Sequence, residues 1–417
     1  MSSIIIDGPR RVSGRIKVSG SKNAVLAILA ASVMCPKVSL RRVPQLLDVS
    51  VLMTLLAHCG VNISRQTEDH FVLDCTGISC FEADYTLVRR LRASFFILGP
   101  LLTRYGFARI SLPGGCRIGA RPVDLHLDAL RQMGASISIN HGYVTASAED
   151  GLVGAHIDFP KVSVGATHTA IMAACLAKGR TTITNAAREP EVGALIDFLS
   201  LAGAQITGKD TSKIVIDGVA ELSEVDYELI PDRIQTGTYL IAAAMTQGDI
   251  ICEGACAGHL ESLLALLRAG GAEIAEYSDS ISLSMRQRPL AQSLTTAIYP
   301  HFPTDLQAPM MALNAIAEGS SQVTETLFEN RYMHVPELVR MGADISVEGQ
   351  HALIHGVPML QAAQVQASDL RAGAALMLAG MCAQGQTTIA KAHHIDRGYE
   401  NIASHMSAMG IQISRLD

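Results

Sequence analysis

The sequence predicts an α/β protein of two domains, each built from three related units of about 70 residues around buried helices. Three observations lead to this fold class. The length of 417 residues fits two or three domains. A short glycine motif recurs six times along the chain. Several helical stretches are apolar on all sides, which is typical of helices that are buried rather than amphipathic.

The recurring motif is a Gly-x-x-Ile step after a stretch with helical periodicity. A glycine in the left-handed conformation ends a helix, and the alternating residues after it begin a strand. Successive glycines lie 68 to 74 residues apart, so six units fill the chain as two domains of three. The six steps begin at Gly60, Gly134, Gly203, Gly271, Gly342 and Gly410.

A second set of glycines follows the apolar helical stretches, and a strand such as Thr181–Ile183 comes after each. The helices that end at the first set carry a charged face, and we expect them at the surface. Buried helices inside, with sheets and amphipathic helices outside, make an inside-out arrangement. The second set is Gly106, Gly179, Gly248, Gly319 and Gly385, and the expected buried helices span 24–34, 166–177, 236–246, 308–317 and 372–383.

Composition excludes several classes of protein. The chain has 33 Lys and Arg against 39 Asp and Glu, a net charge of −6, which argues against a general nucleic-acid binder. No apolar stretch is long enough to span a bilayer, and the N-terminus lacks the features of a secretory signal. Nine scattered cysteines predict reduced thiols in a cytoplasmic protein without a metal site.

The predicted starts of the buried helices carry cations where cations oppose the helix dipole. Helix capping explains why side chains with oxygen atoms occur at these starts, since such atoms accept the free backbone N–H groups. The capping candidates are Ser21, Ser163, Thr304 and Ser368 or Asp369. Caps do not explain the positive charges, so we expect a bound anion, and helix N-termini already favour phosphate. The cations are Lys22, Arg92, Lys161, Arg233 and Arg371.

The segment 112–126 predicts a loop because it is rich in glycine and proline. Cys116 lies in this loop between Arg117 and Arg121. Nearby cations lower the pKa of a thiol and favour the reactive thiolate. We therefore predict that Cys116 is reactive and that the other cysteines are structural.

These motifs together resemble the UDP-N-acetylglucosamine 1-carboxyvinyltransferase family of enolpyruvyl transferases, in order and over nearly the whole chain. The run Pro113-Gly114-Gly115-Cys116 through Val123-Asp124-Leu125-His126 is the most specific part of the match. The weaker parts are 20–24, 92–94, 185–191, 231–234, 302–305, 328–334, 369–371 and 394–399.

The resemblance implies an inside-out α/β barrel with one domain over 22–229 and a second over 1–21 and 230–417. It also implies the reaction, in which phosphoenolpyruvate and UDP-N-acetylglucosamine give the 3-O-enolpyruvyl sugar nucleotide and phosphate, the first committed step of peptidoglycan synthesis. No cofactor, metal, nucleic acid or membrane is expected. The oligomeric state is left open, with a monomer expected.

Site residues follow from the resemblance. Cys116, in the catalytic loop 112–122, is the implied acid, and Asp305 is the implied base near the sugar hydroxyl; Lys22 and Arg397 complete the catalytic set. The implied phosphoenolpyruvate ligands are Lys22, Asn23, Arg121, Arg331, Arg371 and Arg397. The implied sugar-nucleotide ligands are Asn23, Arg92, Arg121, Pro122, Val123, Asp124, Leu125, Lys161, Ser163, Val164, Gly165, Asp305 and Leu327.

Three positions depart from the family pattern: Gln235 stands for a usual Glu, Ala27 for Pro and Leu327 for Val. One methylene in a pocket is worth about 1–3 kcal/mol, so Leu327 bears on acceptor choice. Two alternatives stay open. One is an enolpyruvyl transferase with another acceptor, such as a free uridine nucleotide. The other is a non-catalytic sugar-nucleotide-binding protein. The presence of Cys116 and Asp305, the implied acid and base, argues against this alternative.

Overall fold

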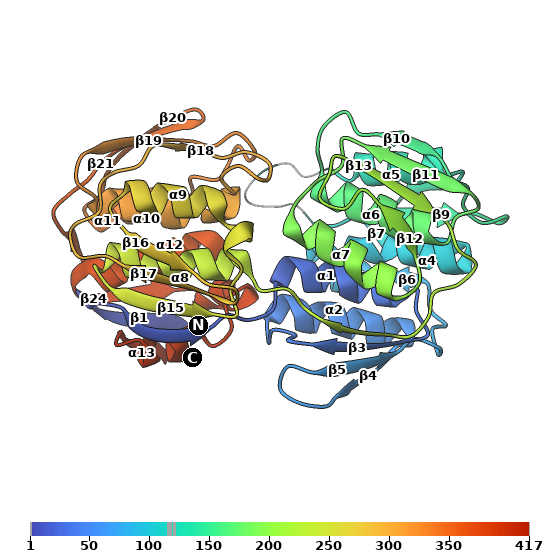
Figure 1. The fold of residues 1–417 in the computed structure, drawn as a ribbon, viewed down its shortest axis with the longest axis horizontal. Coiled ribbons are helices and arrows are strands. Elements are labelled where there is room, and N and C mark those ends of the chain that lie inside the picture. The colour runs from blue at the N-terminus through green and yellow to red at the C-terminus, as the bar shows by residue number, and fades with distance from the viewer. Residues whose placement is uncertain (1, 115–118, 120–121, 417) are drawn as a thin grey trace. The chain divides into compact units, whose positions relative to one another are not determined.

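A computed structural model describes residues 2–114, 119 and 122–416, and this part of the chain divides into two compact units (Figure 1). The N-unit contains residues 20–114 and 122–230. The C-unit contains residues 2–19, 119 and 231–416. Each unit has its own hydrophobic core of buried residues.

Six sheets, three in each unit, share one pairing pattern. An edge strand runs parallel to its neighbour, which starts an antiparallel run of two further strands. The N-unit sheets are β14 (Val225–Glu228), β3 (Lys37–Arg41), β5 (Phe71–Asp74) and β4 (Asn62–Arg65); β6 (Glu82–Ala83), β7 (Phe107–Ser111), β9 (Tyr143–Ser147) and β8 (Ser136–Asn140); and β10 (His156–Asp158), β11 (Arg180–Thr184), β13 (Lys213–Asp217) and β12 (Gln205–Thr207).

The C-unit repeats this pattern with strands from both ends of the chain. Its sheets are β2 (Ser13–Lys17), β15 (Asp249–Glu253), β17 (Ser280–Ser284) and β16 (Glu273–Glu276); β18 (Leu294–Thr295), β19 (Ser320–Thr324), β21 (His351–His355) and β20 (Asp344–Glu348); and β22 (Leu360–Gln361) with β23 (Gln364–Gln366), β24 (Ala383–Ala390), β1 (Ser3–Gly8) and β25 (Gln412–Leu416). Ile4 pairs with Ile389 of β24, and Ile6 pairs with Ile413 of β25, so the N-terminal strand lies inside the last sheet.

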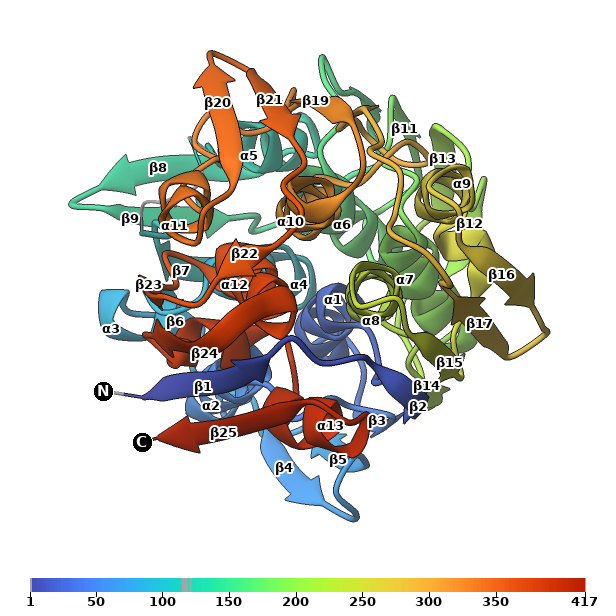
Figure 2. The same cartoon turned by 90° about the vertical axis from the view of Figure 1, so that its left-hand side faces the viewer.

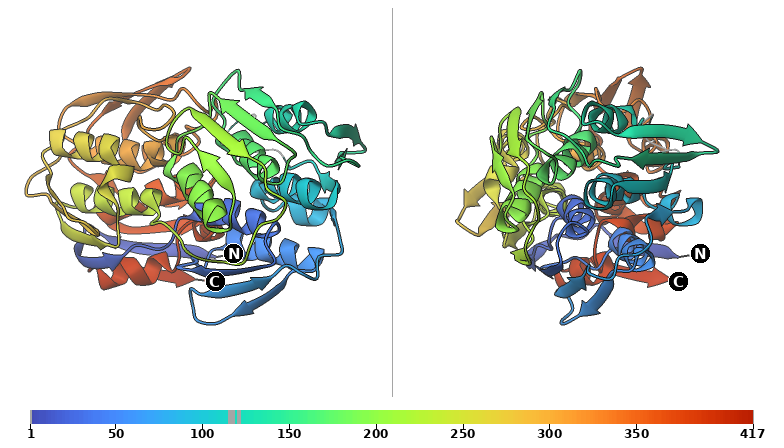
Figure 3. Two further views of the ribbon diagram at one scale, coloured as in Figure 1. Left: turned by 45° about the vertical axis from the view of Figure 1, so that its right-hand side comes forward. Right: turned by 90° about the vertical axis from the view of Figure 1, so that its right-hand side faces the viewer.

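The apolar helices lie inside each unit, as the sequence predicts. The C-unit helices α8, α10 and α12 pack on one another, and Figure 2 shows them end-on with the strands around them. In the N-unit, the blue-to-green ribbon of Figure 3, strands also lie outside the helices. These inner helices are α1 (Lys22–Ser32), α4 (Leu98–Tyr105), α6 (Val164–Cys175), α8 (Arg233–Met245), α10 (Gln307–Ile316) and α12 (Leu370–Cys382). The inside-out α/β arrangement is therefore confirmed.

The remaining helices are more exposed, with one exception. In α7, nine of twelve residues are buried, because the helix is apolar on most sides and packs against α1 and α6. The prediction of a surface helix was therefore wrong at this position. The remaining helices are α2 (Leu47–Cys59), α3 (Tyr85–Val88), α5 (Asp124–Gln132), α7 (Pro190–Leu201), α9 (Glu261–Ala269), α11 (Val335–Arg340) and α13 (Ile402–Ala408), and the short 3-10 turns are η1 (Arg92–Ile97), η2 (Ala257–His259), η3 (Thr304–Leu306) and η4 (Ala392–Arg397).

The glycine repeat has the conformation that the sequence predicts. All six glycines of the first set are left-handed, with φ between 89° and 105°. In the second set Gly248 differs, since the preceding Gln247 takes the left-handed position with φ 54°. A Cβ on Gly248 would lie 2.1 Å from the carbonyl oxygen of Val12, so this glycine permits a close approach of the backbone instead.

The cysteines among the described residues are free thiols. Burial raises the pKa of Cys35, Cys59, Cys75 and Cys382 to about 12, which keeps these thiols protonated and unreactive. Within the described ranges, no helix is both long and apolar enough to cross a membrane, and no group of three or more His, Cys, Asp or Glu side chains is arranged to hold a metal ion.

Candidate active site

The starts of the inner helices are capped as the sequence predicts, with one correction. The side chains of Ser21, Ser163 and Asp369 accept backbone N–H groups of α1, α6 and α12. Asp232 caps α8 in the same way. Thr304 does not cap, because its hydroxyl donates to Glu325 Oε2 at 2.8 Å. Capping leaves the adjacent cations available for other contacts.

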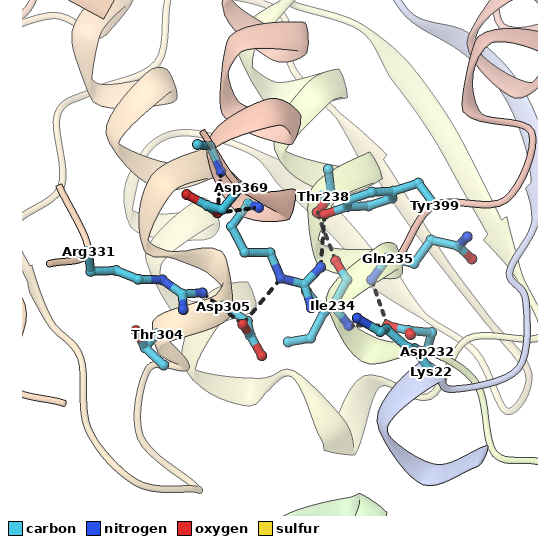
Figure 4. A network of polar contacts seen from close by, with 12 residues as sticks. Lys22, Asp232, Ile234, Gln235, Thr238, Thr304, Asp305, Arg331, Asp369 and Tyr399 are labelled. Carbon is cyan, nitrogen blue, oxygen red and sulfur yellow. Dashed lines mark hydrogen bonds and ion pairs between the residues drawn. The ribbon is translucent and has the colours of Figure 1, made fainter. Parts of the chain in front are cut away.

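In the C-unit, one carboxylate holds two arginines. Asp305 Oδ1 accepts Nη2 of Arg331 at 2.8 Å and Nε of Arg371 at 3.2 Å (Figure 4). The two arginine side chains are only 4% and 8% exposed, whereas that of Asp305 is 30% exposed. Asp305 lies in η3 just before α10, Arg331 follows β19, and Arg371 lies in the first turn of α12. We call these three residues the arginine–aspartate cluster.

The charges in this cluster determine the protonation of Asp305. Burial alone would raise the pKa of its carboxyl, but Arg371 and Arg331 outweigh this effect and hold the pKa well below its usual range. Burial works against the charge of Arg371 as well, but Asp305 outweighs it and raises the arginine pKa. Asp305 and Arg371 are therefore both charged at neutral pH. With two arginines against one carboxylate, the cluster suits the binding of an anion.

Arg371 has further support on its own side of the cluster. Its Nη1 donates to the Tyr399 hydroxyl at 3.3 Å, and that hydroxyl lies 2.8 Å from Thr238 Oγ1. Asp369 Oδ1 accepts the backbone N–H of Arg371 at 2.8 Å, which fixes the start of α12. The segment His394–Tyr399 was part of the resemblance, but no role for Tyr399 or Thr238 was predicted.

A buried acid organises the loop that carries Arg331. Glu325 is 2% exposed, and its Oε1 accepts the backbone N–H groups of Leu327 at 2.8 Å and Phe328 at 3.1 Å. Its Oε2 holds Thr304, next to Asp305. Glu325 thus positions two segments of the cluster at once. Sequence analysis missed it, because β19 is mostly polar and gives no sign that the acid after it is buried.

In the N-unit, Lys22 makes a buried ion pair. Its Nζ lies 2.8 Å from Oδ2 of Asp48, and the two side chains are 11% and 2% exposed. Lys22 is the first residue of α1, and Asp48 lies in the first turn of α2. The negative charge of Asp48 is stabilised by the dipole of α2, because Asp48 lies at the N-terminal end of that helix. The same carboxylate holds the ammonium of Lys22 in place. Sequence analysis missed Asp48 as well.

Other predicted nucleotide ligands lie at neighbouring turns of the N-unit. Arg92 begins η1, and its Nη2 donates to the carbonyl oxygen of Pro122 at 3.4 Å. Gly165 lies against the ring of His126, where a Cβ would be 2.9 Å from Cε1, so only glycine fits without a shift. The hydroxyl of Thr169 holds the His126 ring at 2.8 Å.

The remaining predicted residues are spread over both units. In the N-unit, Asn23, Val123, Ser163 and Val164 are half-buried, Pro122, Asp124 and Lys161 are exposed, and Leu125 is buried. In the C-unit, Arg397 ends η4 and is half-buried, and Leu327 is 38% exposed. Cys116 and Arg121 lie outside the described residues.

The amide at position 235 is explained by its contacts. Gln235 Oε1 accepts the backbone N–H of Ser19 at 2.8 Å, and its Nε2 donates to Ser19 Oγ at 3.3 Å. Ser19 Oγ in turn donates to Glu400 Oε2 at 3.2 Å. A glutamate at 235 could accept from the backbone but could not donate to the hydroxyl, and it would add a second carboxylate near Glu400.

Comparison with known proteins identifies the class. Residues 6–406 match the family described as EPSP synthase (3-phosphoshikimate 1-carboxyvinyltransferase), and the chain belongs to this family of enolpyruvyl transferases. The structure resembles EPSP synthase from Acinetobacter baumannii, with a TM-score of 0.76 and 17% identity over 100% of both chains, which supports the fold.

More similar relatives carry the name of one branch. The chain is 48% identical over 418 aligned positions to the UDP-N-acetylglucosamine 1-carboxyvinyltransferases of Cronobacter sakazakii and Escherichia coli O1:K1, covering 100% of this chain and 99% of theirs. It also resembles the enolpyruvyl transferase NikO from Streptomyces tendae, with a TM-score of 0.89 and 25% identity over 99% of this chain and 98% of that one. The resemblance predicted from the motifs is confirmed.

Proposed function

We propose that this transferase moves the enolpyruvyl group of phosphoenolpyruvate to the 3-hydroxyl of UDP-N-acetylglucosamine and releases phosphate, the first committed step of peptidoglycan synthesis. The full-length identity of 48% to transferases of that name carries the proposal. The arginine–aspartate cluster supports it, because the reaction needs buried cations to hold the negative charges of the substrate and an ionised carboxylate to act as the base. We further propose that the enzyme acts as a monomer in the cytoplasm.

The reaction needs groups that move protons and groups that bind the charges of phosphoenolpyruvate. Carbon 3 of the enol must gain a proton while the sugar hydroxyl loses its proton to a base and attacks carbon 2. The tetrahedral product then loses phosphate together with a proton from carbon 3, which restores the double bond. We assign Arg331 and Arg371 of the C-unit to the carboxylate of phosphoenolpyruvate. Lys22 of the N-unit binds its phosphate, as a compact point charge suits that group. Further phosphate ligands are Arg121 and Arg397, and Cys116 is the acid.

Asp305 is assigned as the base, and its contacts imply how substrate binding makes it a stronger base. A carboxylate whose pKa is held well below the usual range is a weak base. When the substrate carboxylate takes up hydrogen bonds from Arg331 and Arg371, it competes with Asp305 for the same donors. Binding of phosphoenolpyruvate therefore raises the pKa of Asp305 and makes it a stronger base.

The test is an acceptor assay. Phosphate release from phosphoenolpyruvate is measured with UDP-N-acetylglucosamine, UMP and shikimate 3-phosphate as separate acceptors. We expect turnover with the first acceptor and loss of turnover in Cys116→Ser. Release only with UMP would instead favour a nucleotide acceptor, and no release with any acceptor would favour a binding protein. Either result rejects the proposal.

A further inference from the structure

Arg371 lies at one end of a chain of hydrogen-bonded hydroxyl groups inside the C-unit. From the arginine, the chain runs to Tyr399 and on to Thr238, which lies one turn into α8 (Figure 4). Thr238 Oγ1 also lies 2.8 Å from the carbonyl oxygen of Ile234. Tyr399 is 1% exposed and Thr238 is fully buried, so neither hydroxyl exchanges its partners with bulk water.

Counting protons shows which way each hydrogen bond points. The carbonyl of Ile234 only accepts, so Thr238 must give it its single hydroxyl proton. Thr238 can then only accept a hydrogen bond from Tyr399, and Tyr399 donates its single hydroxyl proton in that bond. The tyrosine oxygen is left with its lone pairs facing Nη1 of Arg371, a group that only donates. The chain therefore has one direction, from arginine to helix carbonyl.

We propose that Tyr399 and Thr238 are positioning residues that orient Arg371 for the reaction, and this inference rests on the proposed function. The guanidinium is planar and presents its donors at fixed angles. With Nη1 held by Tyr399, Nε points at Asp305, and the second terminal nitrogen is directed by the same plane. A one-way chain does not permit Tyr399 to turn its proton toward the arginine without losing a bond at Thr238.

The support is neutral, and this matters for binding an anion. A second carboxylate in place of Tyr399 would hold Arg371 more tightly but would cancel the charge that attracts the substrate. Burial raises the pKa of the Tyr399 hydroxyl, against the opposing effect of Arg371, so the group stays protonated and neutral. The hydroxyl chain thus fixes the direction of the arginine and leaves its charge for the ligand.

The decisive variants are Tyr399→Phe and a matched control, Tyr239→Phe. Tyr239 is also fully buried in the C-unit and donates or accepts one hydrogen bond, to His405 Nδ1 at 3.2 Å, but it does not contact the arginine. We expect Tyr399→Phe to lower kcat/KM for phosphoenolpyruvate about tenfold. We expect Tyr239→Phe to leave kcat/KM unchanged, although its thermal stability should fall by about as much as that of Tyr399→Phe.

Position 238 gives an independent test that keeps the fold intact. Thr238→Ser retains the hydroxyl and should keep wild-type kinetics, whereas Thr238→Val removes it and should lower kcat/KM about threefold to tenfold. The double variant with Tyr399→Phe should be no worse than Tyr399→Phe alone, because the two residues act through one chain. Equal kinetics for the serine and valine variants, or additive losses in the double variant, would overturn the proposal.

A measurement without turnover separates this inference from the proposed function. The Nε–H signal of Arg371 in a 15N spectrum, assigned with Arg371→Lys, should show slow hydrogen exchange in the wild type. Exchange should speed up in Tyr399→Phe and stay slow in Tyr239→Phe. Unchanged exchange in Tyr399→Phe would refute the positioning role, whatever acceptor the enzyme uses, and an acceptor failure with the expected exchange pattern would refute only the proposed function.

Discussion

The two units place different charges at the starts of their inner helices. In the C-unit, Asp305 holds two arginines, and a neutral hydroxyl chain supports one of them. In the N-unit, Lys22 is held by Asp48 in a pair that is almost completely buried. The repeated fold therefore supplies equivalent positions, and the side chains at those positions decide whether a site keeps surplus positive charge or balances it locally.

The largest effect is expected at Asp305. Asp305→Ala should lower kcat by about 10²–10⁴, the usual range for a lost general base, because no other described acid contacts both arginines. Phosphate release measures kcat, and calorimetry should show that UDP-N-acetylglucosamine still binds. The control is Asp344→Ala, an exposed acid on β20 of the same unit. Wild-type turnover in Asp305→Ala would remove Asp305 from the mechanism.

The corresponding change in the N-unit is Asp48→Asn. It removes the carboxylate charge 2.8 Å from the buried ammonium of Lys22, so we expect a loss of about 3–5 kcal/mol of unfolding free energy and a higher KM for phosphoenolpyruvate. Urea unfolding and steady-state kinetics measure the two effects. The control, Asp197→Asn, breaks the half-exposed pair with Lys209 and should cost less than about 1 kcal/mol. Equal losses in both variants would show that burial of the Lys22 pair carries no extra stability.

Acid should weaken both units to a similar degree. Burial lowers the pKa of His168 in the N-unit and His334 in the C-unit to about 4, from 6.5 when unfolded. The unfolded chain binds protons first, so stability is complete above pH 6.5 and falls as pH drops toward 4. The two pKa values imply about 3 kcal/mol for each histidine at pH 4.

Single variants test this pH dependence. In His168→Gln and His334→Gln, the fall in unfolding free energy between pH 7 and pH 4 should be smaller by about 3 kcal/mol than in the wild type. His351→Gln, at an exposed position on β21, should keep the wild-type slope. If both buried variants also kept that slope, the histidines would have to be charged in the folded protein.

The smallest effect is expected at a surface pair. Arg180 makes two bonds to Asp217, at 2.7 and 2.9 Å, across strands β11 and β13. Both side chains are well exposed, so Asp217→Asn should cost about 0.2–1 kcal/mol and less at high salt. Urea unfolding at low and high salt measures this. A loss as large as that of Asp48→Asn would contradict the view that burial makes the N-unit pair strong.

Much of the fold could be predicted because its signals are local. The six left-handed glycines, the apolar inner helices and most caps depend on residues within one or two turns of each other. The surface prediction failed at α7, whose burial depends on contact with α1 and α6. The position of Cys116 and Arg121 lies outside the described residues, so their roles stay predictions.

The sequence by itself determined the repeat, the inside-out order of helices and strands, and which helix starts carry charge, because backbone conformation and hydrophobic period act over short distances. Only the tertiary structure decided which charges meet. Thr238 and Tyr399 are 161 residues apart, and Asp305 and Arg371 are 66 apart. Hydrogen bonds need partners within about 3 Å and at a fixed angle. Such contacts arise only when separate elements of the chain pack together, so Asp48 and the hydroxyl chain had no local signature that would reveal their partners.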